Sequence, residues 1–268
     1  MRLLPWLALL ALTAGCGQKV DHPALAPECD PATMDCMTYQ PSKGGSVGGG
    51  SDGAGGDDSG GSEGAAISGL VVVYDDDFFD QGVAFSGGAD VSAIGVSGSR
   101  VEARYDGTLF EMDEVLKAPG NWFMVEPDEG QGMLPTITVV DTRATKTDSY
   151  AIGLSSSVTV DNLFVLLGAE RLPSLAQLVV TVVDDQGRSI AGVEAQLAAE
   201  IVAYRQAGGW SESDLGTDDS GMIFLGNVQA SSALAKQTIT LGGSVNARVD
   251  VRARAGALTV VTAVVDPP

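Results

Sequence analysis

Four carboxylates fall within six residues in the segment DDDFFD, residues 75–80, which is the densest group of candidate metal ligands in the sequence. Oxygen-rich loops of this kind bind Ca²⁺, although the segment lacks the alternating ligands and central glycine of an EF-hand loop. Solvated turn residues at the end of a strand are the alternative interpretation. We favour it, so no metal or other cofactor is predicted. The ligands of a calcium site would be Asp75, Asp76, Asp77 and Asp80.

Most enzyme chemistry is excluded by residue types that the C-terminal three quarters of the chain lacks. Residues 67–268 contain no histidine and no cysteine, which removes Ser-His-Asp and Cys-His catalysis and zinc sites built from these ligands. No Gly-Lys-Ser/Thr sequence marks a phosphate-binding loop. A glycosidase needs only two suitably spaced acids and stays as a remote alternative. We predict that the chain is not an enzyme.

The three cysteines are predicted to have two different roles. Cys29 and Cys36 flank a short Pro-containing segment, and an even pair in an exported protein predicts a disulfide bond. The bond would close a small loop within residues 16–43. A two-cysteine metal site completed by His22, the single histidine, is the alternative. Cys16 is left without a partner.

The N-terminus has the order of an export signal: a basic residue, a short apolar run and small residues before Cys16. The run is too short to span a bilayer. Residues 13–16, TAGC, resemble the lipobox of bacterial lipoproteins, although Thr13 stands where Leu is usual. The resemblance implies that residues 1–15 are removed and that Cys16 is acylated. Because Gly17 and not Asp follows, it also implies an outer-membrane location, facing either the periplasm or the exterior.

Charge and composition limit the partners. The formal net charge is −20, and so acidic a chain is repelled by nucleic acid and by anionic lipid headgroups. We therefore predict no nucleic-acid partner; the expected partners are the membrane, through the lipid anchor, and an envelope protein or a glycan. Residues 44–64 contain 11 glycines in 21 positions and cannot bury enough apolar surface to fold. Residues 44–66 are thus predicted to be a disordered linker.

From residue 67 onward, Val-rich segments alternate with turn residues, which predicts an all-β fold. The segment LVVVYDD at 70–76 resembles LVVTVVDD at 178–185, and VEA at 101–103 recurs at 193–195. This internal repeat predicts two tandem antiparallel β-sandwich domains of immunoglobulin-like or transthyretin-like type, at residues 67–170 and 171–268. No strong amphipathic-helix pattern follows residue 20, although residues 111–117 could form a turn or two of helix.

The second predicted domain has a recognisable order of turns. The Asp-x-x-Gly turn at 184–187 leads to IAGV at 190–193, and the Thr-Asp-x-x-Gly turn at 217–221 precedes an apolar strand. This order is similar to the carboxypeptidase-regulatory-like, or transthyretin-like, domains of bacterial surface proteins. The resemblance implies a seven-stranded sandwich that serves as a stabilising or adhesive module without catalytic residues.

Two aromatic loops offer candidate binding surfaces, because aromatic side chains commonly anchor interfaces. They contain Phe78 and Phe79 in one loop and Tyr204 and Trp210 in the other. Packing of these rings back onto the sandwich is the alternative. The sequence therefore predicts a non-catalytic cell-envelope lipoprotein with structural or adhesive sandwich domains. A glycan- or protein-binding module that uses the aromatic loops, with Ca²⁺ assistance, is the second hypothesis.

Overall fold

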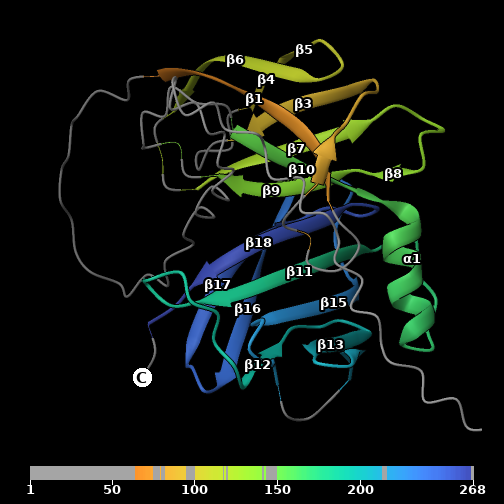
Figure 1. Ribbon diagram of the computed structural model, residues 1–268, viewed down its shortest axis with the longest axis vertical. Coiled ribbons are helices and arrows are strands. Elements are labelled where there is room, and N and C mark those ends of the chain that lie inside the picture. Colours follow the sequence, from red (N-terminus) through yellow and green to blue (C-terminus); the bar gives the residue numbers. More distant parts are fainter. Residues whose placement is uncertain are drawn as a thin grey trace, which may run out of the picture. The chain divides into compact units, whose positions relative to one another are not determined.

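Strands make up nearly all of the regular secondary structure (Figure 1), which confirms the predicted all-β class. The computed structural model describes residues 64–74, 79, 82–94, 100–116, 118, 120–140, 142, 150–212 and 216–266. Within these residues there is one helix, and no helix there is long and apolar enough to cross a membrane. The first strand begins at Gly64, so the last residues of the predicted linker belong to the fold.

A six-stranded sheet forms the outer layer of the first half. Its order is β5-β6-β1-β10-β8, and β2 pairs with the end of β1. The central strand β1 pairs antiparallel with β6 and parallel with β10. The strands are β1 (Gly64–Tyr74), β2 (Gly82–Ala84), β5 (Arg104–Tyr105), β6 (Leu109–Leu116), β8 (Met133–Leu134) and β10 (Tyr150–Ser156).

A nine-stranded sheet runs through both halves in the order β14-β13-β15-β11-β18-β9-β7-β3-β4. The halves meet where β9 pairs parallel with β18, with Thr136 opposite Leu258 and Thr138 opposite Val260. Strands from both sides of residue 170 are therefore hydrogen-bonded in one sheet. The strands are β3 (Ala89–Ile94), β4 (Arg100–Glu102), β7 (Asn121–Pro127), β9 (Thr136–Val140), β11 (Ala176–Val183), β13 (Ile201–Gln206), β14 (Gly209–Ser211), β15 (Met222–Val228) and β18 (Leu258–Val264).

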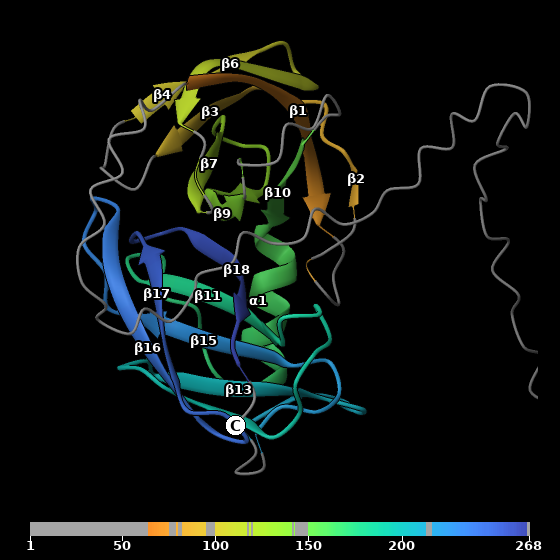
Figure 2. The same cartoon turned by 90° about the vertical axis from the view of Figure 1, so that its left-hand side faces the viewer.

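The second half of the nine-stranded sheet is covered on both faces (Figure 2). A three-stranded sheet of β12 (Val193–Gln196), β16 (Ala235–Gly243) and β17 (Ala247–Ala253) covers one face. The helix α1 (Ser157–Leu166) covers the other. Successive side chains of a strand point to opposite faces. Accordingly Leu178 packs in the core that includes β16 and β17, whereas Val179 packs in the core that includes α1.

Strand β7 connects the cores of the two halves. Its Phe123 and Val125 are buried in the core beneath the six-stranded sheet, whereas Trp122 and Met124 are buried in the core shared with the second half. Burial on both faces explains why this strand is a continuous apolar run and not an alternating one. The halves are thus joined by packing as well as by hydrogen bonds.

The internal repeat has a counterpart in the pairing of strands. In the first half, the first strand β1 pairs parallel with the last strand β10 and antiparallel with β6. In the second half, the first strand β11 pairs parallel with the last strand β18 and antiparallel with β15. The two segments that resemble each other in sequence therefore occupy corresponding central positions.

Two local predictions differ from the structure. Residues 111–116 are strand and not helix, because they belong to β6. Glu114 has a φ of 62° beside a register shift between β1 and β6, and this irregularity spaces the buried residues Phe110, Met112 and Val115 unevenly. The helix α1 was not predicted, because apolar side chains on nearly all of its sides leave little amphipathic pattern.

Candidate functional site

Several residues that the sequence singles out lie outside the described part of the chain. The acylation, disulfide, calcium and Phe78 predictions therefore stay predictions. These residues are Cys16, Cys29, Cys36, Asp75, Asp76, Asp77, Phe78 and Asp80.

The remaining aromatic residues of the predicted binding loops pack inward. Phe79 is 2% exposed and lies in the core that includes α1. Tyr204 is also buried, and its hydroxyl accepts a hydrogen bond from the backbone N–H of Ala195 at 3.1 Å. Trp210 is half-buried, with its ring edge-on to Phe224 at 6.1 Å. Phe79 and Tyr204 are core residues, and neither can anchor a ligand from this position.

The helix α1 is held tightly on its inner side. Ser156 caps its N-terminus by accepting a hydrogen bond from the backbone N–H of Val158 at 3.1 Å. The Phe164 ring lies edge-on to Phe224 with centroids 5.5 Å apart. Arg171, which follows the helix in the chain, forms an ion pair with Asp161 of the helix. The helix therefore has one fixed orientation on the sheet.

The outer side of α1 exposes large apolar side chains. Val158 is 61% exposed, Val165 74% and Leu166 70%. Val158 and Val165 are seven residues apart, so they point in nearly the same direction, and Leu166 is about 100° away. We call Val158, Val165 and Leu166 the α1 face. The exposed Asn162 lies between Val158 and Leu166 on this side of the helix, so the three apolar side chains of the α1 face adjoin a polar one; exposed apolar surface rimmed by polar residues marks interaction sites.

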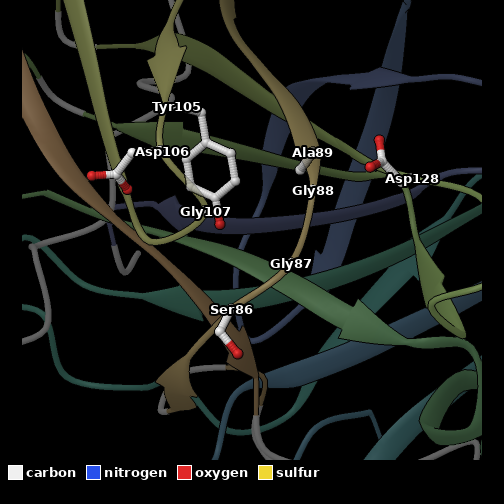
Figure 3. Close-up of a pocket in the computed structure, with 8 residues that line it drawn as sticks. All are labelled: Ser86, Gly87, Gly88, Ala89, Tyr105, Asp106, Gly107 and Asp128. Carbon is white, nitrogen blue, oxygen red and sulfur yellow. The ribbon is translucent and has the colours of Figure 1, made fainter.

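An open pocket of about 560 Å³ lies in the first half, between the segment that follows β2 and the turn from β5 to β6 (Figure 3). Asp106 fixes the turn, since its Oδ1 accepts hydrogen bonds from the backbone N–H groups of Thr108 and Leu109. At Gly88 an added Cβ would lie 1.9 Å from a carboxylate oxygen of Asp128. The lining residues are Ser86, Gly87, Gly88, Ala89, Tyr105, Asp106, Gly107 and Asp128.

The pocket combines an aromatic hydroxyl with two carboxylates, which Figure 3 shows on either side of Tyr105. The Tyr105 hydroxyl is buried and has no hydrogen-bond partner among the described residues. Burial, and then the Asp106 carboxylate, raise the pKa of Tyr105. The backbone N–H groups of Leu109 and Thr108 lower the pKa of Asp106. The pocket therefore places a buried, unpartnered hydroxyl near two carboxyl groups, a combination suited to hydroxyl-rich ligands.

Neither site was found from the sequence. The signal for α1 was the run of three serines at 155–157, which contains the N-cap residue and the first residue of the helix. The signals for the pocket were Gly87-Gly88 and Asp106-Gly107. In the described part of the chain, no group of three or more His, Cys, Asp or Glu residues is arranged to hold a metal ion.

No family model and no curated protein matches the sequence. Among solved structures, the chain is similar to a Streptococcal ancillary pilin, with 13% identity over 75% of this chain and 68% of that one and a TM-score of 0.23. It is also similar to the Bacillus anthracis TIE protein, with 10% identity, a TM-score of 0.21 and coverage of 75% of this chain but 34% of that one. TM-scores this low do not establish a common fold.

Proposed function

We propose that this chain is a non-catalytic, lipid-anchored protein of the cell envelope, and that it contacts a partner protein through the α1 face. The N-terminal resemblance to bacterial lipoproteins and the lack of histidine and cysteine in residues 67–268 support the first part. The observation that carries the second part is the exposure of Val158, Val165 and Leu166 on one helix.

Exposing the apolar side chains of α1 to water is unfavourable in free energy, and a partner that covered them would remove this penalty. A helix with apolar residues on nearly all sides is typical of a buried position, yet α1 is buried on one side only. Covering apolar surface is favourable by roughly 25 cal/mol per Å². Because α1 rests on a sheet joined to the first half, the face would be presented rigidly at the end of the linker.

The α1 face is tested by placing a charge in it. We expect Val165→Glu to lower capture of the envelope partner at least tenfold, since a carboxylate cannot be buried in an apolar interface without a large desolvation penalty. The measurement is cross-linking of the full chain in native envelopes, followed by mass spectrometry. Val83→Glu is the matched control, because Val83 on β2 has the same 74% exposure. Equal loss of cross-links in both variants would show that the α1 face has no specific role.

The anchor is tested separately at Cys16. Cells given a palmitate analogue should label the wild-type chain and leave a Cys16→Ala variant unlabelled, because the thiol is the predicted site of acylation. Detergent-phase partitioning of the two chains gives an independent readout. Labelling that persists in Cys16→Ala would disprove acylation at Cys16.

Glycan binding in the pocket is the second candidate function, and the unpartnered Tyr105 hydroxyl beside two carboxylates favours it. We expect neutral oligosaccharides to shift the NMR signals of Gly87, Gly88 and Gly107, and Asp128→Ala to weaken this binding about tenfold. Asp113→Ala is the control, since Asp113 is an exposed acid on β6 outside the pocket. A panel of oligosaccharides that shifts no pocket signal would remove this candidate.

A further inference from the structure

Two arginines stand out in a chain with 15 basic and 35 acidic residues. Among the residues that the structure describes, Arg248 and Arg252 are the cations without an ion pair or hydrogen bond of the side chain. Arg205 has an interaction of its own. The cations that form ion pairs with carboxylates are Arg100, Arg104, Arg171, Arg188, Lys236 and Arg254.

Both unpaired arginines project from the same side of one strand. They are four residues apart on β17 and alternate with the buried Val249 and Val251, so they lie on the outer surface of the three-stranded sheet. Lys236 on β16 is directly opposite Arg252. Like charges directly opposite in a sheet are destabilising. We call Lys236, Arg248 and Arg252 the basic face.

The surface around the basic face is polar and also carries acidic groups, since Glu194 on β12 is exposed on the same side of the three-stranded sheet. Asp250 lies between the two arginines, but its carboxylate is occupied by Lys236 at 2.7 Å and by the Thr238 hydroxyl at 2.7 Å. Thr240 is opposite Arg248. The two arginines therefore project from Cα positions about 13 Å apart, at roughly 3.3 Å per residue, with Thr240 on the neighbouring strand beside Arg248.

The basic face lies on the same side of the fold as the point where the N-terminal segment enters. β1 runs parallel to β10, and β10 leads directly into α1, so Gly64 lies at the end of β1 that is away from α1. The three-stranded sheet covers the face of the nine-stranded sheet opposite α1. Figure 1 shows this arrangement, with the start of β1 and β17 toward the left and α1 on the right.

We propose that the basic face docks on the anionic phospholipid headgroups of the membrane that holds the anchor. This inference rests on the lipid anchor of the proposed function. Exposed charges are screened beyond about 8 Å at physiological ionic strength, so the local face and not the net charge of −20 decides the contact. Each arginine at an anionic surface strengthens binding roughly fivefold, and the tether keeps the face near the membrane. The α1 face would then point away from the lipid.

The test uses the chain from residue 16 to 268 with Cys29→Ser and Cys36→Ser, so that Cys16 is its single thiol. Coupling Cys16 to a maleimide lipid in vesicles replaces natural acylation, so the result does not depend on whether the cell acylates the chain. The readout is the rate at which an amine-reactive reagent acetylates Lys236, whose side chain is 67% exposed in the fold.

We expect Lys236 to react at least threefold more slowly on phosphatidylcholine vesicles containing phosphatidylglycerol than on phosphatidylcholine alone. High salt or Arg248→Gln with Arg252→Gln should abolish the protection. The matched control is Arg100→Gln with Arg104→Gln, which removes the same charge from arginines paired elsewhere. Equal rates on both vesicles, or equal loss of protection in the control, would overturn the proposal. Protection by soluble heparin as strong as that by the vesicles would also overturn it, because it would assign the face to polyanions and not to lipid.

Discussion

Replacing Phe164 with alanine lowers the free energy of unfolding by about 3–5 kcal/mol, the usual range for a buried phenylalanine. Phe164 is 1% exposed, and its ring is edge-on to Phe224. The ring also covers Gly226, where an added Cβ would lie 2.9 Å from it. Chemical denaturation of the purified chain measures the change.

Val165→Ala is the control for Phe164→Ala. The two residues are adjacent on α1, but Val165 is 74% exposed, so its truncation should change stability by less than about 0.5 kcal/mol. Phe164→Ala should also weaken partner capture, because the α1 face depends on the docked helix. Val165→Glu should weaken capture without loss of stability. A Phe164→Ala chain as stable as Val165→Ala would mean that α1 is not packed as described.

The all-β class and most strands could be predicted from local pattern alone. β9 is the short β-branched run TITVV, a pattern that by itself indicates a buried strand. The arrangement of strands could not be predicted in the same way. Pairing of Thr136 with Leu258 joins residues more than a hundred positions apart, and nothing in either segment specifies the other.

The candidate sites depend on exposure, which a single sequence encodes weakly. Val160 and Val165 have the same side chain in the same helix, yet Val160 is buried and Val165 is exposed. The difference comes from which side of α1 faces the sheet. In the same way Tyr204 is an aromatic residue near glycines, as a binding loop would have, but strand β13 directs it into the core. Residue type identified candidate binding residues, and tertiary packing determined which of them are exposed.

Asn227 is the residue whose loss should most affect the connection between the halves. It is 3% exposed on β15 and has a φ of 54°. Its amide binds the segment that joins α1 to β11: Oδ1 accepts a hydrogen bond from the N–H of Leu172 at 2.9 Å, and Nδ2 donates to the carbonyl of Glu170 at 2.9 Å. Nδ2 also donates to the carboxylate of Glu200 at 2.8 Å. One side chain therefore fixes this connecting segment against the sheet.

Asn227→Ala should lower the free energy of unfolding by about 4–5 kcal/mol. Each lost hydrogen bond costs about 1 kcal/mol, and the left-handed backbone costs alanine roughly 1–2 kcal/mol more. Asn227→Gly separates the two causes, because glycine accepts this backbone but makes no side-chain bonds; it should recover about 1 kcal/mol.

Asn227→Asp brings a second carboxylate to Glu200, so repulsion should raise the pKa of the new carboxyl and make the variant relatively more stable at pH 4 than at pH 7. Denaturation of all three variants at both pH values tests this account; if Asn227→Ala and Asn227→Gly were both as stable as wild type, the hydrogen bonds to Glu170 and Leu172 would not hold the connecting segment.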